Sequence, residues 1–104
     1  MTTPPEMAAA MARLWEKFLP EMEQRVVLIE EAAQALKAGS LTEAQREAAH
    51  AAAHKLAGSL GLFGMAQGTE IARGLEALLE TTPLDADGLS DGARELRAVI
   101  ATRN

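Results

Sequence analysis

The sequence predicts an all-α fold: an antiparallel four-helix bundle with an additional N-terminal helix. Hydrophobic residues make up 48% of the 104 positions but aromatic residues only 3%. Alanine and leucine dominate, and both lose little entropy in a helix. Apolar residues recur three and four positions apart, and no window alternates long enough to indicate a strand. Short connections between the helical segments favour antiparallel neighbours.

The composition narrows the classes of function and location. A net charge of −5 argues against nucleic-acid binding, which uses basic patches for phosphate contacts. The chain has no cysteine, which excludes disulfides and thiolate metal sites. The first residues lack the layout of a signal peptide, and no apolar run reaches the ~18–20 residues that span a bilayer. We therefore expect a cytoplasmic protein with no nucleic-acid and no membrane partner.

Prolines mark the N-terminal part of the chain. Residues 1–5, which end in two prolines, are expected to form a disordered tail before a bundle domain at 6–104. Pro20 interrupts a helical pattern, because proline removes one backbone hydrogen bond. We expect either a break at Leu19 or a bent, nearly continuous helix, and favour a kink or short break before a helix at 21–37. Buried stripes are expected at Met7, Met11, Leu14, Trp15 and Phe18, and at Met22, Val26, Ile29, Ala33 and Leu36.

The next helix carries the residues of most interest. Gly39 ends the preceding helix as a left-handed cap, and Ser40 with Glu43 has the pattern of a capping box. The helix is therefore expected at about 41–62. Its buried stripe leaves His54 beside the core rather than within it. That stripe consists of Ala49, Ala52, Ala53, Leu56, Leu60 and Phe63.

Two further helices complete the expected bundle. Gly64 is a natural stop, and a helix at about 66–80 follows it. After a loop, a last helix starts at Ser90 or Asp91 and ends near Thr102. Their buried residues are expected at Ile71, Leu75, Leu78, Leu79, Ala93, Leu96, Val99 and Ile100.

His54 stands among unusually small neighbours. Residues three and four apart share one face of a helix, so Ala57 and Gly58 lie next to His54, with Gly61 one turn further on. Glycine inside a helix costs about 0.5–1 kcal/mol relative to alanine and so needs a reason. One reason is a low surface that lets another macromolecule reach the imidazole. The other is close packing between helices.

The same stretch resembles a known family. His-x-Leu-x-Gly-Ser, followed by a glycine ten residues after the histidine, is similar to the signature of histidine-containing phosphotransfer (HPt) domains. The matching residues are His54, Leu56, Gly58, Ser59 and Gly64. The stretch 61–64 is also similar to the phosphorylatable domain of chemotaxis histidine kinases. At one position the chain departs from the pattern, because Ala57 stands where the family usually has lysine.

The resemblance implies a phosphorelay intermediate. His54 would accept a phosphoryl group and pass it to an aspartate, so that the partners are a histidine kinase and response-regulator receiver domains. A histidine side chain suits this role. Because its ordinary pKa is ~6.5, it is mostly neutral at neutral pH, and the neutral ring has one nitrogen with a free lone pair. The expected docking surface is small or apolar. It consists of Ala57, Gly58, Ser59, Gly61 and Leu62.

Glu76 is the expected partner of His54. If the two helices pack antiparallel about the turn at 61–65, a residue in the low-to-middle seventies lies nearest His54. Within the resemblance this position is Glu76, which matches a glutamate of the chemotaxis-kinase domain. A carboxylate that accepts the Nδ1 proton would fix the tautomer and leave Nε2 free. The alternative is a solvated glutamate paired with Arg73 on its own helix.

Arg73 and Lys55 are the candidate cations for the phosphoryl group. Positive charge stabilises the equatorial oxygens in the transition state of phosphoryl transfer. Arg73 sits one turn before Glu76 and could replace the lysine missing at Ala57. Lys55 is rotated by about 100° from His54 on a helix. The alternative for both is an ordinary solvated charge.

His50 lies one turn before His54, and two histidines four apart can hold a metal ion. Because no third ligand of obvious spacing is apparent, we expect a flanking surface histidine and no metal site. No nucleotide-binding motif is present. We therefore expect a monomeric phosphocarrier that is not an enzyme and has no cofactor, with Mg²⁺ held by the partner receiver. The alternative function is a helical adaptor or dimerisation module that is not phosphorylated.

Overall fold

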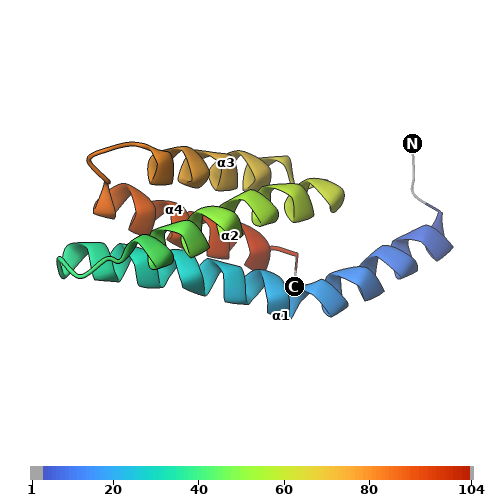
Figure 1. The fold of residues 1–104 in the computed structure, drawn as a ribbon. Helices are drawn as coiled ribbons and strands as arrows, with labels where there is room; N and C mark the ends of the chain where they lie inside the picture. Colours follow the sequence, from blue (N-terminus) through green and yellow to red (C-terminus); the bar gives the residue numbers. More distant parts are fainter. Residues whose placement is uncertain (1–3, 104) are drawn as a thin grey trace.

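The computed structural model describes residues 4–103 and contains four helices, α1 (Pro5–Lys37), α2 (Glu43–Leu62), α3 (Ala66–Glu80) and α4 (Ala86–Ala101). No strand occurs in the described part. Successive helices run antiparallel (Figure 1). Both α2 and α4 pack against α1 and α3, which closes the bundle. The predicted all-α, antiparallel four-helix architecture is therefore confirmed.

The prediction of an additional, separate N-terminal helix is wrong. A single helix of 33 residues, α1, takes the place of the two predicted helices and contains Pro20 in its interior. Figure 1 shows α1 changing direction, with its N-terminal part extending past the other three helices. Proline removes one hydrogen bond, and the bonds of the turns around it can continue a helix through the bend. The bent, nearly continuous helix is thus the outcome.

The predicted tail at residues 1–5 is only partly testable. Residues 1–3 lie outside the described part of the chain. Pro4 caps α1 and Pro5 is its first residue, so the expectation of a disordered tail is wrong at Pro5. Proline is well suited to this position, since its fixed φ matches the helix and a first-turn N–H would have no helical partner.

The N-terminal part of α1 also corrects the expected buried stripe. Trp15 is buried and stacks edge-on against Phe63 of the segment after α2, with ring centroids 5.1 Å apart. In contrast, Met7 is 58% exposed and Leu14 is 38% exposed. These two side chains have the correct spacing but remain exposed, although Met11 between them packs against the core. Helical periodicity identifies a face, and only tertiary packing decides whether that face is covered.

Two predicted helix starts are wrong, for a reason visible in the caps. Thr42, not Ser40, caps α2: its side chain accepts from Gln45 N at 3.1 Å while the Gln45 side chain accepts from Thr42 N at 2.9 Å. The Ser40 hydroxyl instead donates to a carbonyl at the end of α1. In α4, Asp85 accepts from Gly88 N at 2.9 Å, so the helix begins at Ala86. Serine and threonine patterns two residues apart both fit a capping box.

The predicted helix ends are confirmed. Gly39 and Gly64 adopt left-handed backbone conformations, with φ of 72° and 71°. This region favours glycine because it has no Cβ. The end of α2 at Leu62 and the bounds of α3 at Ala66 and Glu80 also match the expectation.

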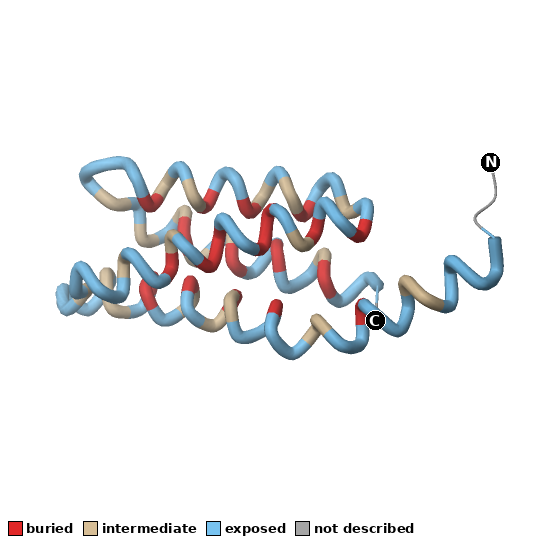
Figure 2. The backbone as a smooth tube through the Cα atoms, turned by 45° about the vertical axis from the view of Figure 1, so that its right-hand side comes forward, coloured by how far each residue is buried: buried red, intermediate tan, exposed pale blue. Residues whose placement is uncertain are grey.

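The core is apolar and lies between the four helices (Figure 2). All six stripe residues predicted for α2 are buried. Six other predicted core residues are only partly buried, namely Met11, Phe18, Leu36, Ile71, Leu78 and Val99. No polar or charged residue of the described chain is buried. The charged and polar side chains of the described residues therefore lie at the surface. Within residues 4–103, no helix is long and apolar enough to span a membrane.

Candidate functional site

The candidate site is centred on the contact between His54 of α2 and Glu76 of α3. Nδ1 of His54 lies 2.8 Å from Oε2 of Glu76. The His54 side chain is 73% exposed, whereas that of Glu76 is only 21% exposed. An ionised carboxylate can only accept a hydrogen bond, so a neutral His54 ring in this contact carries its proton on Nδ1 and its lone pair on Nε2. The site combines a fixed tautomer with a ring that solvent reaches freely.

The packing of α2 on α3 determines this contact. At one end of the pair, Arg46 Nε donates to the carbonyl oxygen of Leu79 at 2.8 Å. At the other end, the Thr69 hydroxyl donates to the carbonyl oxygen of Ala57 at 3.1 Å. His54 lies between these two ties. The antiparallel pairing predicted from the turn is thus held at both ends, and it brings His54 opposite Glu76.

The two glycines beside His54, Gly58 and Gly61, differ in how closely other helices pack against them. A Cβ built at Gly58 would meet no atom within 4 Å, whereas one at Gly61 would meet the Thr69 hydroxyl at 3.4 Å. Close packing between helices therefore explains neither residue strongly and does not explain Gly58 at all. What remains at Gly58 is the open, low surface beside an exposed imidazole.

The other expected docking residues lie around this opening. Gly58 and Gly61 are exposed and Ser59 is partly buried. Leu62 is 64% exposed, a large apolar side chain in open solvent. Ala57 is only 7% exposed, so it offers little surface of its own.

The expected cations Arg73 and Lys55 are exposed. Neither pairs with a described residue in an ion pair or side-chain hydrogen bond, so both remain available to a ligand. Arg73 lies on α3 between the level of Thr69, which contacts Ala57, and that of Glu76, which contacts His54. Lys55 follows His54 directly on α2. The structure therefore puts one free cation on each of the two helices that form the site.

A third cation near the site was not predicted. Arg25 of α1 approaches the Ser59 hydroxyl at 3.5 Å and pairs with Glu21 at 3.0 Å. Its side chain is only 19% exposed, so it is held against α2. Nothing in the spacing of α2 indicates Arg25, because the contact arises from the packing of α1 on α2. The only signal in the sequence is that Arg25 follows Glu21 by one turn.

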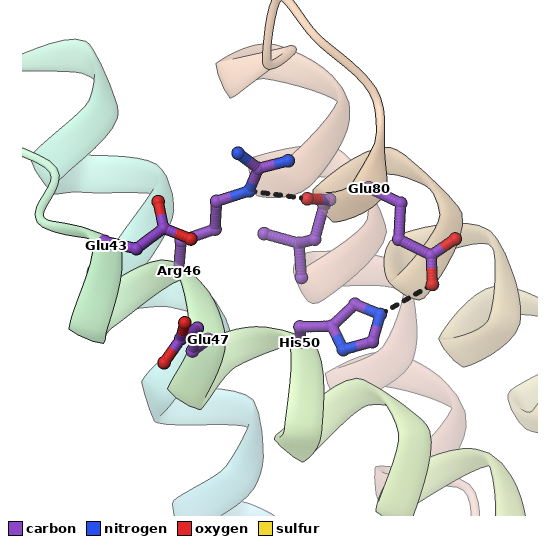
Figure 3. A pocket seen from close by; sticks show the side chains of 6 residues that line it. Glu43, Arg46, Glu47, His50 and Glu80 are labelled. Carbon is purple, nitrogen blue, oxygen red and sulfur yellow. Dashed lines mark hydrogen bonds and ion pairs between the residues drawn. The ribbon is translucent and has the colours of Figure 1, made fainter.

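His50 has partners that the sequence did not reveal. Its Nε2 lies 2.7 Å from Oε1 of Glu80 and 3.8 Å from Oε2 of Glu76. Figure 3 shows His50 and Glu80 facing each other from α2 and α3. The two residues line an open pocket of about 420 Å³ with Glu43, Arg46, Glu47 and Leu79. His50 is therefore not an isolated surface histidine.

The geometry around His54 supports nucleophilic chemistry on a macromolecular partner. The free Nε2 belongs to an exposed ring and is backed by a carboxylate that stabilises positive charge on the imidazole. Free cations on α2 and α3 suit a substrate that carries negative charge. A phosphoryl group carried in by a protein partner fits these features.

Comparison with known proteins agrees with this chemistry. A family model described as the Hpt domain matches residues 13–102 of the 104-residue chain. A search of the curated proteins and a search of the solved structures each found no match. Hpt domains are phosphocarrier modules of phosphorelays, not kinases, and they interact with kinases and receiver domains. With nearly its whole length matched, and a histidine–glutamate pair at its surface, this chain belongs to the Hpt domain family.

Proposed function

We propose that the chain carries a phosphoryl group on Nε2 of His54 between a histidine kinase or receiver aspartate and a further receiver aspartate. The single observation that supports this most strongly is the exposed imidazole whose Nδ1 is held by Glu76 at 2.8 Å. Membership of the Hpt family supplies the reaction class. The cytoplasmic location expected from the sequence is part of the same proposal.

The transfer step follows from the tautomer. The Nε2 lone pair attacks the phosphorus of an aspartyl phosphate, the N–P bond forms, and the P–O bond to the aspartate breaks. The aspartate leaves as a carboxylate with the bonding electron pair. The ring gains positive charge, and the Nδ1 proton shared with Glu76 stabilises it. The return step to the next aspartate reverses this sequence with the same atoms.

Charge stabilisation at the phosphoryl group is assigned to the free cations. Arg73, which extends from α3 one turn before Glu76, takes the role of the lysine missing at Ala57. Lys55 adds positive charge from the His54 helix. Mg²⁺ is expected on the acidic site of the receiver, since this cation favours oxygen ligands together with substrate phosphates.

The partner docks over the face of α2 that carries His54. Gly58 and Gly61 keep that face low, and the exposed Leu62 offers an apolar contact next to it. Arg25 and Ser59 form a polar margin on the α1 side. A small apolar centre with a polar rim is the composition of a transient interface.

The alternative function, an adaptor or dimerisation module that is not phosphorylated, has one observation in its favour. The N-terminal part of α1 extends past the bundle with Met7 and Leu14 exposed. That surface is separate from His54. Under this alternative, His54→Ala leaves partner binding and signalling unchanged, whereas the phosphocarrier proposal requires signalling to be lost.

A label-transfer assay tests the proposal directly. The chain is incubated with a receiver carrying a radiolabelled aspartyl phosphate, and acid-labile label on the chain is measured. We expect label on the wild type and on His50→Gln, and none on His54→Gln. His50 is the matched control because it is the only other histidine in the sequence. Label that persists in His54→Gln contradicts the proposal.

A further inference from the structure

We propose that His50, Glu76 and Glu80 form a binding site for a divalent transition metal of the Zn²⁺ class between α2 and α3. One nitrogen and two carboxylate oxygens of these residues lie within 4.8 Å of one another. Nε2 of His50 is 2.7 Å from Glu80 Oε1 and 3.8 Å from Glu76 Oε2. Two of the three ligands come from the neighbouring helix α3, so the spacing of residues within α2 did not reveal the site.

The spacing of these atoms suits a tetrahedral ion. Bonds of about 2.0–2.2 Å from Zn²⁺ to nitrogen and oxygen put neighbouring ligand atoms about 3.3–3.5 Å apart. The separations of His50 Nε2 from the two carboxylate oxygens, 2.7 and 3.8 Å, lie on either side of that value. All three ligand atoms lie within 4.8 Å of one another, so rotamer changes on the order of 1 Å bring them to tetrahedral spacing. Three protein ligands leave one coordination position for water.

The backbone around the site is already held in position. Arg46 of α2 binds the carbonyl oxygen of Leu79, the residue immediately before Glu80. This contact holds the end of α3 against the turn of α2 that carries His50 (Figure 3). The ligands therefore come from two helices whose register is fixed without a metal, which lowers the ordering cost of binding.

Charge and ligand type select the class of ion. The adjoining pocket is lined by Glu43, Glu47 and Glu80 against one cation, Arg46, so its field attracts cations. Imidazole with carboxylates and no thiolate suits Zn²⁺, Cu²⁺, Ni²⁺ and Co²⁺. Mg²⁺ prefers oxygen ligands in an octahedral arrangement and keeps its waters. We therefore expect discrimination against Mg²⁺.

The proposed metal site shares Glu76 with the phosphoryl acceptor His54. Oε2 of Glu76 accepts the Nδ1 proton of His54 at 2.8 Å, and the same atom lies 3.8 Å from Nε2 of His50. A metal bound there withdraws electron density from the carboxylate and adds positive charge beside the imidazole. Both effects make Nε2 a weaker nucleophile. Resting on the function proposed above, this predicts that bound metal slows phosphotransfer.

Equilibrium dialysis of the full chain against Zn²⁺ tests the site itself. We expect one ion per chain, and at least about a tenfold loss of affinity in both His50→Gln and Glu80→Gln. Glu47→Gln is the matched control, because it removes the same charge from the same pocket but leaves the three ligands in place. Equal weakening by Glu47→Gln and Glu80→Gln overturns the proposal, as does a wild type that binds Zn²⁺ no better than Mg²⁺.

Phosphotransfer in the presence of Zn²⁺ tests whether metal bound through Glu76 slows the reaction at His54. Saturating Zn²⁺ is expected to lower the rate of label transfer to the wild type and to Glu47→Gln, and to have little effect on Glu80→Gln. Equal inhibition of all three places the effect on the receiver and contradicts the coupling. A wild type that accepts no label without Zn²⁺ refutes the phosphocarrier function, while the dialysis result still decides whether the metal site exists.

Discussion

At the scale of single residues, the contact between His54 Nδ1 and Glu76 Oε2 decides which nitrogen can react. It assigns the proton to one atom and the lone pair to the other, which is exposed. The Glu76 side chain is only 21% exposed, so its position is set by its packing on α3 rather than by solvent. Under the proposed function, the reactivity of the exposed His54 therefore depends on a partner from another helix.

Removing the Glu76 carboxylate is expected to slow phosphotransfer. Glu76→Ala lowers the rate by about 10–100-fold, the usual cost of losing a carboxylate that orients a histidine. Glu76→Gln retains most of the rate, since an amide oxygen still accepts the Nδ1 proton. Stopped-flow transfer from a phosphorylated receiver measures both. Glu70→Ala on the exposed side of α3 is the control, and an unchanged rate in Glu76→Ala contradicts the assigned role.

Arg73 is expected to contribute through charge. Arg73→Ala lowers the transfer rate by roughly tenfold, corresponding to about 1.4 kcal/mol of transition-state stabilisation. Arg73→Lys restores most of it, because the charge is retained. The same stopped-flow assay distinguishes the two variants. A lysine variant as slow as the alanine variant means that Arg73 does not act through its charge.

The smallness of Gly58 is expected to matter to the partner and not to the fold. Gly58→Ala raises the free energy of unfolding by about 0.5–1 kcal/mol, since its Cβ meets no atom within 4 Å. Gly58→Leu keeps the fold and blocks transfer. Gly74, exposed on α3 with the same free space, is the matched control, and Gly74→Leu leaves transfer intact. Denaturant unfolding measures the stability of Gly58→Ala, and the transfer assay measures the activity of the leucine variants. A normal transfer rate in Gly58→Leu contradicts close docking of the partner at this position.

At the scale of elements, helix ends were easier to predict than helix starts. Gly39 and Gly64 act through their own backbone conformations, so the sequence identifies both stops. A start depends on which of several capable side chains turns back onto the helix. Ser40 and Thr42 both fitted the pattern, and the structure uses Thr42. Whether α1 continues through Pro20 also depends on how the helices pack, and the spacing of apolar residues in the sequence does not determine that packing.

The cap of α2 gives a stability prediction. Thr42→Ala lowers the free energy of unfolding by about 1 kcal/mol, because it leaves the Gln45 N–H without its acceptor. Ser40→Ala, outside the helix, changes it by less than about 0.5 kcal/mol. Urea unfolding followed by circular dichroism compares the pair. The reverse order of effects means that Ser40 caps the helix after all.

At the scale of the whole molecule, the site depends on contacts between helices that are distant in sequence. The register of an antiparallel pair about a short turn placed the partner of His54 in the low-to-middle seventies, and the resemblance to HPt domains identified it as Glu76. Glu80 at His50 and Arg25 at Ser59 were missed, since each depends on side-chain reach between helices. The bundle is also tied from α1 to α4, where Arg97 forms two hydrogen bonds with Glu30 that raise the pKa of Arg97.

The most direct test of the whole account is the identity of the phosphorylated atom. The chain, labelled with ¹⁵N in its imidazole rings, is phosphorylated by a receiver and its nitrogen–phosphorus couplings are recorded by NMR. The account predicts one coupled nitrogen, Nε2 of His54, with the proton of that ring still on Nδ1 beside Glu76. Phosphate on Nδ1, on His50 or on no histidine contradicts it.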